Sequence, residues 1–165
     1  MARSVRGIED LLVAEIGRRG LGEVVATGHR EVRFRPTRRA APGVTALATA
    51  DDVFVLAAEV GGIGRARGDL ARLARAVQAA DLAAALRVRA ACGGPPGASV
   101  DVSASFLGRR AFTRYDVEDT VGAALRRRLG LPYHPRRGGA RAPGDGIGPV
   151  VTIVADRATL AARVG

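Results

Sequence analysis

The sequence predicts a mixed α+β fold, because segments with helical periodicity alternate with segments that read as strands. Between residues 116 and 129, the apolar side chains Val117, Val121, Ala124 and Leu125 recur at helical spacing. Residues 99–106 instead alternate strictly between apolar and polar side chains, as a half-buried strand does. Of the 165 residues, 47% are hydrophobic and 25% are charged, which is the composition of a globular chain able to bury a core.

The first sixty residues are expected to form a strand, a helix, a hairpin and a further strand. The helix should cover residues 8–19, with Ile8, Leu11, Leu12 and Ile16 on one face and acidic residues in its first turn. Residues 24–26 and 32–35 are expected to pair around a turn at 27–29, and residues 37–43 to form a loop. Residues 52–60 read as a buried strand or a short helix, which periodicity does not separate.

A composition change at residues 61–64 predicts two domains, residues 1–62 and residues 63–165. The second should begin with a helical stretch at 69–91, broken near residues 80 and 81. It continues with a strand at 99–106, a helix at 116–129 and two strands at 150–154 and 159–164 around a turn at 155–157. The residues between 135 and 149 are rich in Gly, Pro and Arg and are expected to form a mobile loop.

Several classes of protein are poor matches to this sequence. The longest stretches without a charged residue, 40–50 and 90–100, are shorter than the roughly 18–20 residues of a membrane helix. Glu9 and Asp10 stand where a secretory signal would need its apolar region, so a cytoplasmic location is expected. Cys92 is the only cysteine and His29 and His134 are far apart, so neither a disulfide nor a metal site is expected.

The charge of the chain is strongly one-sided. Lys and Arg together number 26 against 16 acidic residues, which gives a net charge of +10, and every basic residue is Arg. A GC-rich genome would explain why Arg replaces Lys, but not why basic residues are in excess. A charge of this size favours a polyanionic partner, and the planar guanidinium suits phosphate because it donates two hydrogen bonds at once.

Two basic segments are candidates for a nucleic-acid surface. Residues 102–115 contain three arginines interleaved with aromatic residues and no acid, and residues 126–141 contain six arginines and no acid. Cations beside aromatic rings suit contact with phosphate together with base or ribose. The arginines at 126–128 have a second explanation, because cations in the last turn of a helix interact favourably with its dipole. The predicted binding residues are Arg109, Arg110, Arg114, Tyr115, Arg136, Arg137 and Arg141.

Neither a catalytic constellation nor a cofactor loop is recognisable. Acidic pairs such as Glu118 and Asp119 are explained by a helix N-terminus, and the hydroxyl groups lack a nearby His to activate them. The glycines at 62, 64 and 68 do not have the spacing of a dinucleotide-binding loop, and a Walker A loop needs a Lys that the chain lacks. We therefore expect no catalytic residue and no bound cofactor within the chain.

Residues 102–125, from Val102 to Leu125, resemble a THUMP domain. Residues 6–12, 49–54 and 156–160 are similar, in the same order, to the N-terminal region of S-adenosylmethionine-dependent RNA methyltransferases that modify guanine N2. In that family a ferredoxin-like domain precedes the THUMP domain, whose order of elements is helix-helix-strand-helix-strand-strand. The resemblance covers nearly the whole chain and implies a ferredoxin-like domain followed by an α/β THUMP domain.

The resemblance also implies binding of RNA, with tRNA and its acceptor stem and 3′ end as the expected partner. In the family a Rossmann-like catalytic domain follows, with a glycine-rich loop for S-adenosylmethionine and an Asp/Asn-Pro-Pro-Tyr motif. Neither occurs here, and Leu131, Pro132 and Tyr133 do not replace that motif. S-adenosylmethionine is thus implied only for a catalytic domain absent from these 165 residues.

Three hypotheses remain open at this point. The first is a substrate-recognition module of an RNA guanine-N2 methyltransferase, or a truncated form of one. The second is a non-catalytic adaptor that supplies protein and RNA contacts to a separately encoded RNA-modifying enzyme. The third is a truncation without function. Copurification of a catalytic partner would favour the second hypothesis, and copurification of RNA alone would favour the first.

Overall fold

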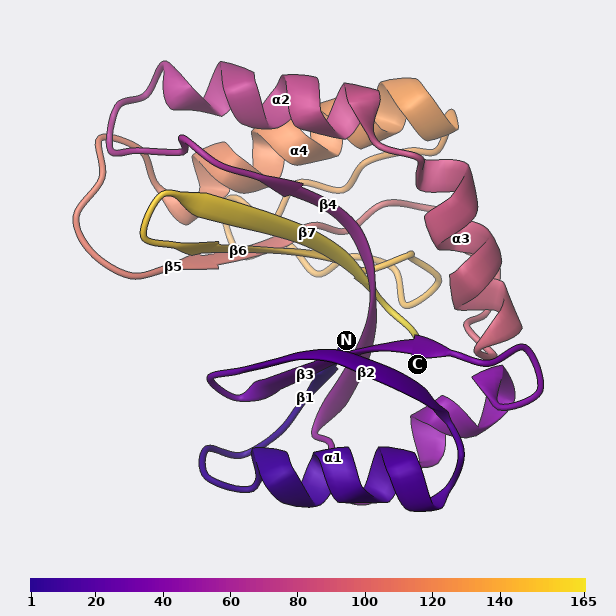
Figure 1. Ribbon diagram of the computed structural model, residues 1–165. Helices are drawn as coiled ribbons and strands as arrows, with labels where there is room; N and C mark the ends of the chain where they lie inside the picture. Colours follow the sequence, from indigo (N-terminus) through magenta and orange to yellow (C-terminus); the bar gives the residue numbers. More distant parts are fainter. The chain divides into compact units, whose positions relative to one another are not determined.

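The protein has a mixed α+β fold, described here for residues 1–165 from a computed structural model (Figure 1). The chain forms two compact units that are discontinuous in sequence. The first contains Met1–Val55, Ala83–Pro95 and Arg163–Gly165, and the second contains Leu56–Leu82 and Pro96–Ala162. The division expected between residues 62 and 63 falls within the second unit and stays a prediction.

Seven strands form the sheet, in the order β2-β3-β1-β4-β7-β6-β5. The strands are β1 (Ala2–Arg3), β2 (Gly22–Gly28), β3 (Glu31–Pro36), β4 (Asp52–Val60), β5 (Ser103–Phe106), β6 (Pro149–Val154) and β7 (Arg157–Arg163). The helices are α1 (Glu9–Arg18), α2 (Asp69–Ala79), α3 (Leu82–Ala91) and α4 (Arg114–Leu129), with a 3-10 helix η1 (Ala41–Ala46). None of these helices is long and apolar enough to cross a membrane.

In the first unit, α1 packs on the antiparallel strands β2 and β3 (Figure 1). The predicted helix is confirmed, and its buried face is centred on Leu12 and Ile16. Leu11 was expected on that face but is 59% exposed, and Glu15 is buried in its place. The predicted hairpin forms, with Arg30 in the left-handed region (φ 61°) of its turn.

The buried Glu15 side chain forms hydrogen bonds with the segment that leads into β4. Its carboxylate accepts hydrogen bonds from the backbone N–H of Ala48 and of Thr49, both at 2.9 Å, and from the Thr49 hydroxyl at 2.6 Å. Arg19 adds an ion pair at 3.2 Å. The expected loop at 37–43 was wrong in part, because its last residues begin η1, whose Gly43 and Ala46 carbonyls accept hydrogen bonds from Arg19.

In the second unit, α2 and α4 lie side by side over one face of β4, β7, β6 and β5 (Figure 1). β5 pairs in parallel with β6, and β6 pairs antiparallel with β7. The core between helices and strands is largely aliphatic, with Phe112 as its buried aromatic member. Its fully buried members include Leu73, Val77, Val117, Val121, Val151 and Ile153. The inward positions predicted for the helix at 116–129 are all buried, so that prediction is confirmed.

The predicted strand at 99–106 is shorter than expected. Only its second half forms β5, because Val100 pairs instead with the segment after α4. The Val100 N–H donates to the Pro132 carbonyl at 2.8 Å, and the His134 N–H donates to the Val100 carbonyl at 3.0 Å. This pairing leads the chain after α4 past the beginning of β5.

Candidate nucleic-acid interface

An open hollow of about 550 Å³ lies in the second unit, among the start of β5, the first turns of α4 and the loop at residues 136–142. Its size falls in the range of about 300–1,000 Å³ that is typical of ligand sites. Three arginines and two acidic residues share its surface, so it offers both hydrogen-bond donors and acceptors. The polar and aromatic side chains that line it include Asp101, Arg114, Tyr115, Glu118, Arg136 and Arg141.

The hollow brings together residues from both basic segments that the sequence singled out. Arg114 and Tyr115 come from the first segment, and Arg136 and Arg141 come from the second. Arg141 is exposed and makes no hydrogen bond or ion pair, while Arg136 pairs with Asp101 at 3.3 Å and keeps 43% of its side chain exposed. These two guanidinium groups therefore have donors available for an anion.

Tyr115 lies between arginines rather than open to a base. The Arg114 guanidinium is 4.7 Å from the centre of its ring and donates a hydrogen bond of 2.9 Å to its hydroxyl. The Arg137 guanidinium is 5.7 Å from the same ring. Such cation–π contacts hold long side chains in place, so Tyr115 orients arginines at the edge of the hollow.

Arg109 and Arg110 are neighbours in sequence with different surroundings. Arg109 is exposed and makes no hydrogen bond or ion pair. Arg110 donates to the carbonyls of Ile63, Gly64 and Ala155, and its guanidinium lies 5.4 Å from the ring centre of Phe106. Arg110 thus joins three loops of the second unit, and most of its donors are used inside the fold.

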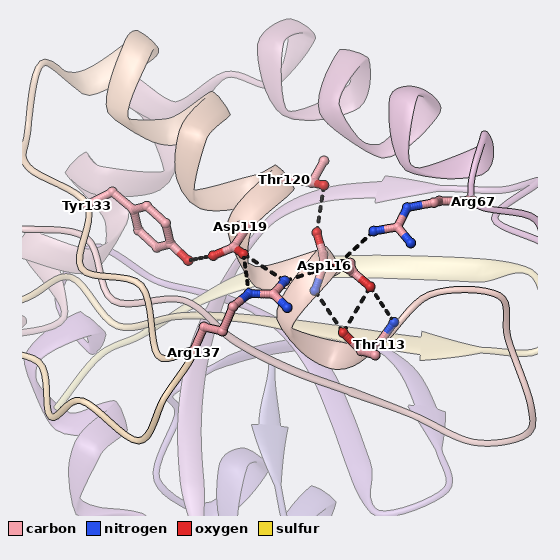
Figure 2. A network of polar contacts seen from close by, with 7 residues as sticks. All are labelled: Arg67, Thr113, Asp116, Asp119, Thr120, Tyr133 and Arg137. Carbon is pink, nitrogen blue, oxygen red and sulfur yellow. Dashed lines mark hydrogen bonds and ion pairs between the residues drawn. The ribbon is translucent and has the colours of Figure 1, made fainter.

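Arg137 is the centre of a polar network at the first turns of α4, shown in Figure 2. It donates to Asp119 from Nε at 3.2 Å and from Nη2 at 3.0 Å, and to Asp116 from Nη2 at 3.0 Å. Arg67 also donates to Asp116, at 3.0 Å. Arg137 therefore fastens the loop that carries Arg136 and Arg141 to the helix that carries Arg114.

Asp116 also closes the N-terminus of α4. It forms a capping box with Thr113, whose backbone N–H and hydroxyl donate to Asp116 Oδ2 at 2.7 and 2.9 Å. These hydrogen bonds from Thr113, with help from Arg137 and Arg67 and against the effect of burial, lower the pKa of Asp116 to about 2. Because this helix N-terminus is capped by a carboxylate, the arginines around it supply the donors for an anion.

Tyr133 completes the network from the other side. Its hydroxyl donates to Asp119 Oδ1 at 2.9 Å (Figure 2), and burial together with this hydrogen bond raises the pKa of Tyr133. The ring fits against α4 because residue 122 is Gly: a Cβ there would lie 2.2 Å from a ring carbon of Tyr133. The glycine is therefore required by the packing of the ring.

Glu118 makes no hydrogen bond to this network and is only 3% exposed, although it lines the hollow. Its Oε1 accepts a hydrogen bond of 3.0 Å from the Ala104 N–H, and its Oε2 has no hydrogen-bond partner. Burial raises the pKa of Glu118, against the opposing effects of that hydrogen bond and of Arg114 and Arg136. A buried carboxylate with one free oxygen thus lies beside three arginines.

The acidic members of the site were not predicted as functional residues. From the sequence, the acidic pair Glu118 and Asp119 was explained by a helix N-terminus alone. A usable signal was present, because Asp116 and Asp119 are three residues apart and so share one helix face. Asp101 had no comparable signal, since only the folded loop brings Arg136 beside it.

The glycine-containing segment before α2 is tied down by contacts within the fold. In the glycine-containing segment before α2, Arg110 holds the carbonyls of Ile63 and Gly64, and Asp69 Oδ2 accepts the Ala66 N–H at 3.1 Å. A carboxylate at that helix start opposes a cofactor's anionic group. No group of three or more His, Cys, Asp or Glu is placed to hold a metal ion.

Known structures share this fold. TrmN from Thermus thermophilus matches 99% of this chain with a TM-score of 0.69 and 26% identity. A predicted N6-adenine-specific DNA methylase from Listeria monocytogenes matches 98% with a TM-score of 0.70 and 18% identity. A possible methylase from Clostridium difficile matches 98% with a TM-score of 0.67 and 16% identity. No protein-family model and no curated protein sequence matches the chain.

The match covers only part of each of those proteins. The chain spans 44% of TrmN, 39% of the Listeria protein and 40% of the Clostridium protein. The two methylases are below 25% identity and therefore bear on the fold alone. The chain thus has the fold of a region that makes up less than half of TrmN and of two proteins described as methylases.

Proposed function

We propose that this chain is an RNA-binding module that recognises the substrate of a S-adenosylmethionine-dependent RNA guanine-N2 methyltransferase. Residues 1–62 would form a ferredoxin-like domain and residues 63–165 a THUMP domain. The resemblance of residues 102–125 to THUMP domains supports this function, as does the shared fold with TrmN and with two proteins described as methylases. S-adenosylmethionine would bind to a catalytic domain and not to residues of this chain.

The observation that carries the proposal is the convergence of Arg114, Arg136 and Arg141 on one open hollow. Arg114 begins α4 and the other two arginines follow the end of this helix, and Arg137 holds their loop against the first turns of α4. Three guanidinium groups around one hollow suit the phosphates of a nucleic-acid strand. The net charge of +10 favours the approach of any polyanion, and the exposed Arg109 extends the same kind of surface. We take tRNA as the partner, with its acceptor stem and 3′ end.

A salt titration of tRNA binding tests this function. Log affinity should fall with log salt at a slope of about −0.7 to −0.9 for each phosphate contact. An acceptor-stem minihelix should compete, and it should compete less well without its single-stranded 3′ end. The double variant Arg136→Ala, Arg141→Ala should bind more weakly and with a shallower slope.

A matched control removes the same charge outside the hollow. Arg72 and Arg75 are exposed on α2 and make no hydrogen bond or ion pair. The double variant Arg72→Ala, Arg75→Ala should change affinity less than the hollow variant does. Equal losses in the two variants would show that only net charge matters. No tRNA binding at low salt would overturn the proposal and favour the adaptor hypothesis.

A further inference from the structure

The lining of the hollow is chemically mixed, which limits what it can bind well. Arg114, Arg136 and Arg141 attract an anion, but Asp101 and Glu118 lie on the same surface. A bare phosphate would gain from the guanidinium groups and lose through repulsion by the carboxylates. A ligand that carries an anion at one end and hydrogen-bond donors at the other satisfies both kinds of group. A nucleotide has this distribution of charge and donors.

Glu118 is the group in the hollow that a donor would satisfy. Its Oε1 is already bonded to the Ala104 N–H, which fixes the orientation of the carboxylate, and its Oε2 is buried without a partner. Leaving a buried charged oxygen without a hydrogen bond is costly, and burial also raises the pKa of Glu118. A donor that reaches Oε2 gains a charge-assisted hydrogen bond and displaces no existing one.

We propose that the hollow holds one unpaired nucleotide of the RNA, with its phosphate at Arg136 and Arg141 and an amino group of its base donating to Glu118 Oε2. The proposal rests on the proposed function and adds base selectivity to it. A carboxylate accepts well from the exocyclic amino group of cytosine, whereas uracil presents a carbonyl oxygen at the same position. Glu118 is therefore the residue that selects the base, and the arginines bind without regard to sequence.

Competition between two RNA hexamers, oligocytidylate and oligouridylate, measures this selectivity directly. The wild-type chain should prefer oligocytidylate about tenfold, as expected for one good base contact. In Glu118→Gln the amide oxygen can still accept from the Ala104 N–H, which places the amide NH₂ where Oε2 was. The preference should then disappear or reverse. Arg136→Ala should weaken both hexamers by the same factor and leave their ratio unchanged.

Two controls keep the result interpretable. Asp156→Asn removes the same charge in the exposed turn between β6 and β7, and it should preserve the preference. A hexamer of N4,N4-dimethylcytidine lacks the amino donors, so with the wild-type chain it should bind no better than oligouridylate. This second control needs no variant and remains decisive if Glu118→Gln fails to fold.

The outcomes separate this inference from the proposed function. Salt-dependent tRNA binding with equal affinity for the two hexamers would overturn the base selectivity and leave the RNA-binding function standing. A preference that survives in Glu118→Gln, or with dimethylated cytidine, would overturn the role of Glu118. Absence of any RNA binding would overturn both proposals.

Discussion

Arg137 donates two hydrogen bonds to the single oxygen Oδ2 of Asp119, and this pair fastens a Gly/Arg-rich loop to α4. By sequence, Arg136 and Arg137 were equal candidates for phosphate contact. The structure separates them, because Arg136 faces the hollow and Arg137 is bonded to two carboxylates. Arg137 is thus a positioning residue for Arg136 and Arg141.

The variant Asp119→Asn distinguishes positioning from simple charge. Removing an acid from the surface should by itself tighten binding to RNA, since it lowers repulsion of phosphate. We expect weaker binding instead, by roughly 3- to 10-fold. The loop loses its charge-assisted hydrogen bonds to Asp119, so Arg136 and Arg141 are no longer held at the hollow. Fluorescence anisotropy with labelled tRNA would measure this, beside Asp156→Asn as the charge-matched control. Tighter binding by Asp119→Asn would show that Arg137 serves the RNA better when it is released.

Arg109 and Arg110 form a second pair for which we predict opposite consequences. Arg110→Lys should destabilise the fold by about 1–3 kcal/mol, because an ammonium cannot serve the carbonyls of Ile63, Gly64 and Ala155 together. Arg109→Ala should leave stability within about 0.5 kcal/mol, because Arg109 is exposed and unpaired. Arg109→Ala should instead lower the affinity of the chain for tRNA.

Urea unfolding followed by circular dichroism, together with the tRNA titration, checks both variants. If Arg110→Lys kept full stability and lost affinity, the role of Arg110 would be in binding, as the sequence pattern alone suggested. If Arg109→Ala left affinity unchanged, the RNA surface would end at the hollow.

The local structure was largely predictable from sequence. The helix at 116–129 shows three signals in its sequence: acids in the first turn, an apolar face, and a glycine after its last residue. Gly130 adopts the left-handed conformation (φ 69°) that ends the helix. The length of β5 was overestimated, because the alternation of apolar and polar residues within a segment does not show which neighbouring segment each residue pairs with. The pairing of Val100 with Pro132 and His134 depends on residues more than thirty positions away.

The site was predictable only as a list of basic residues. Density of arginine pointed to Arg114, Arg136 and Arg141, which do meet in the hollow. It could not separate them from Arg110 and Arg137, because what differs is the set of acceptors around each guanidinium. Those acceptors are loop carbonyls for Arg110 and helix carboxylates for Arg137, and both sets exist only in the folded chain.

Gly122 provides a test of the packing beneath the polar network. Gly122→Ala should destabilise the protein by about 1–3 kcal/mol, since the new methyl group would overlap the Tyr133 ring. The same substitution at Gly17, an exposed position in α1 with open space around it, should stabilise by roughly 0.5–1 kcal/mol. The two shifts in urea midpoint should therefore have opposite signs. A neutral result at Gly122 would mean that the Tyr133 ring can move away, and tRNA affinity should then be tested for loss.

Glu15 should make the stability of the first unit depend on pH in acid. Burial opposes its ionisation, but the hydrogen bonds from Thr49 and Ala48 outweigh it and lower the pKa of Glu15 to about 2, from an ordinary value of 4.5. Between these values the unfolded chain binds more protons than the folded chain, so stability is present above about pH 4.5 and is lost as pH falls toward 2.

In Glu15→Gln the stabilisation by the ionised carboxylate disappears. The slope of unfolding free energy against pH should therefore become shallower between about pH 2 and pH 4.5. The variant should also be less stable at neutral pH by roughly 1–3 kcal/mol, because an amide NH₂ would face backbone N–H donors. Asp116, whose pKa is also about 2, should keep a residual slope in Glu15→Gln, and Asp116→Asn should remove that part. An unchanged slope in Glu15→Gln would mean that the hydrogen bonds from Ala48 and Thr49 to residue 15 do not depend on the charge of the carboxylate.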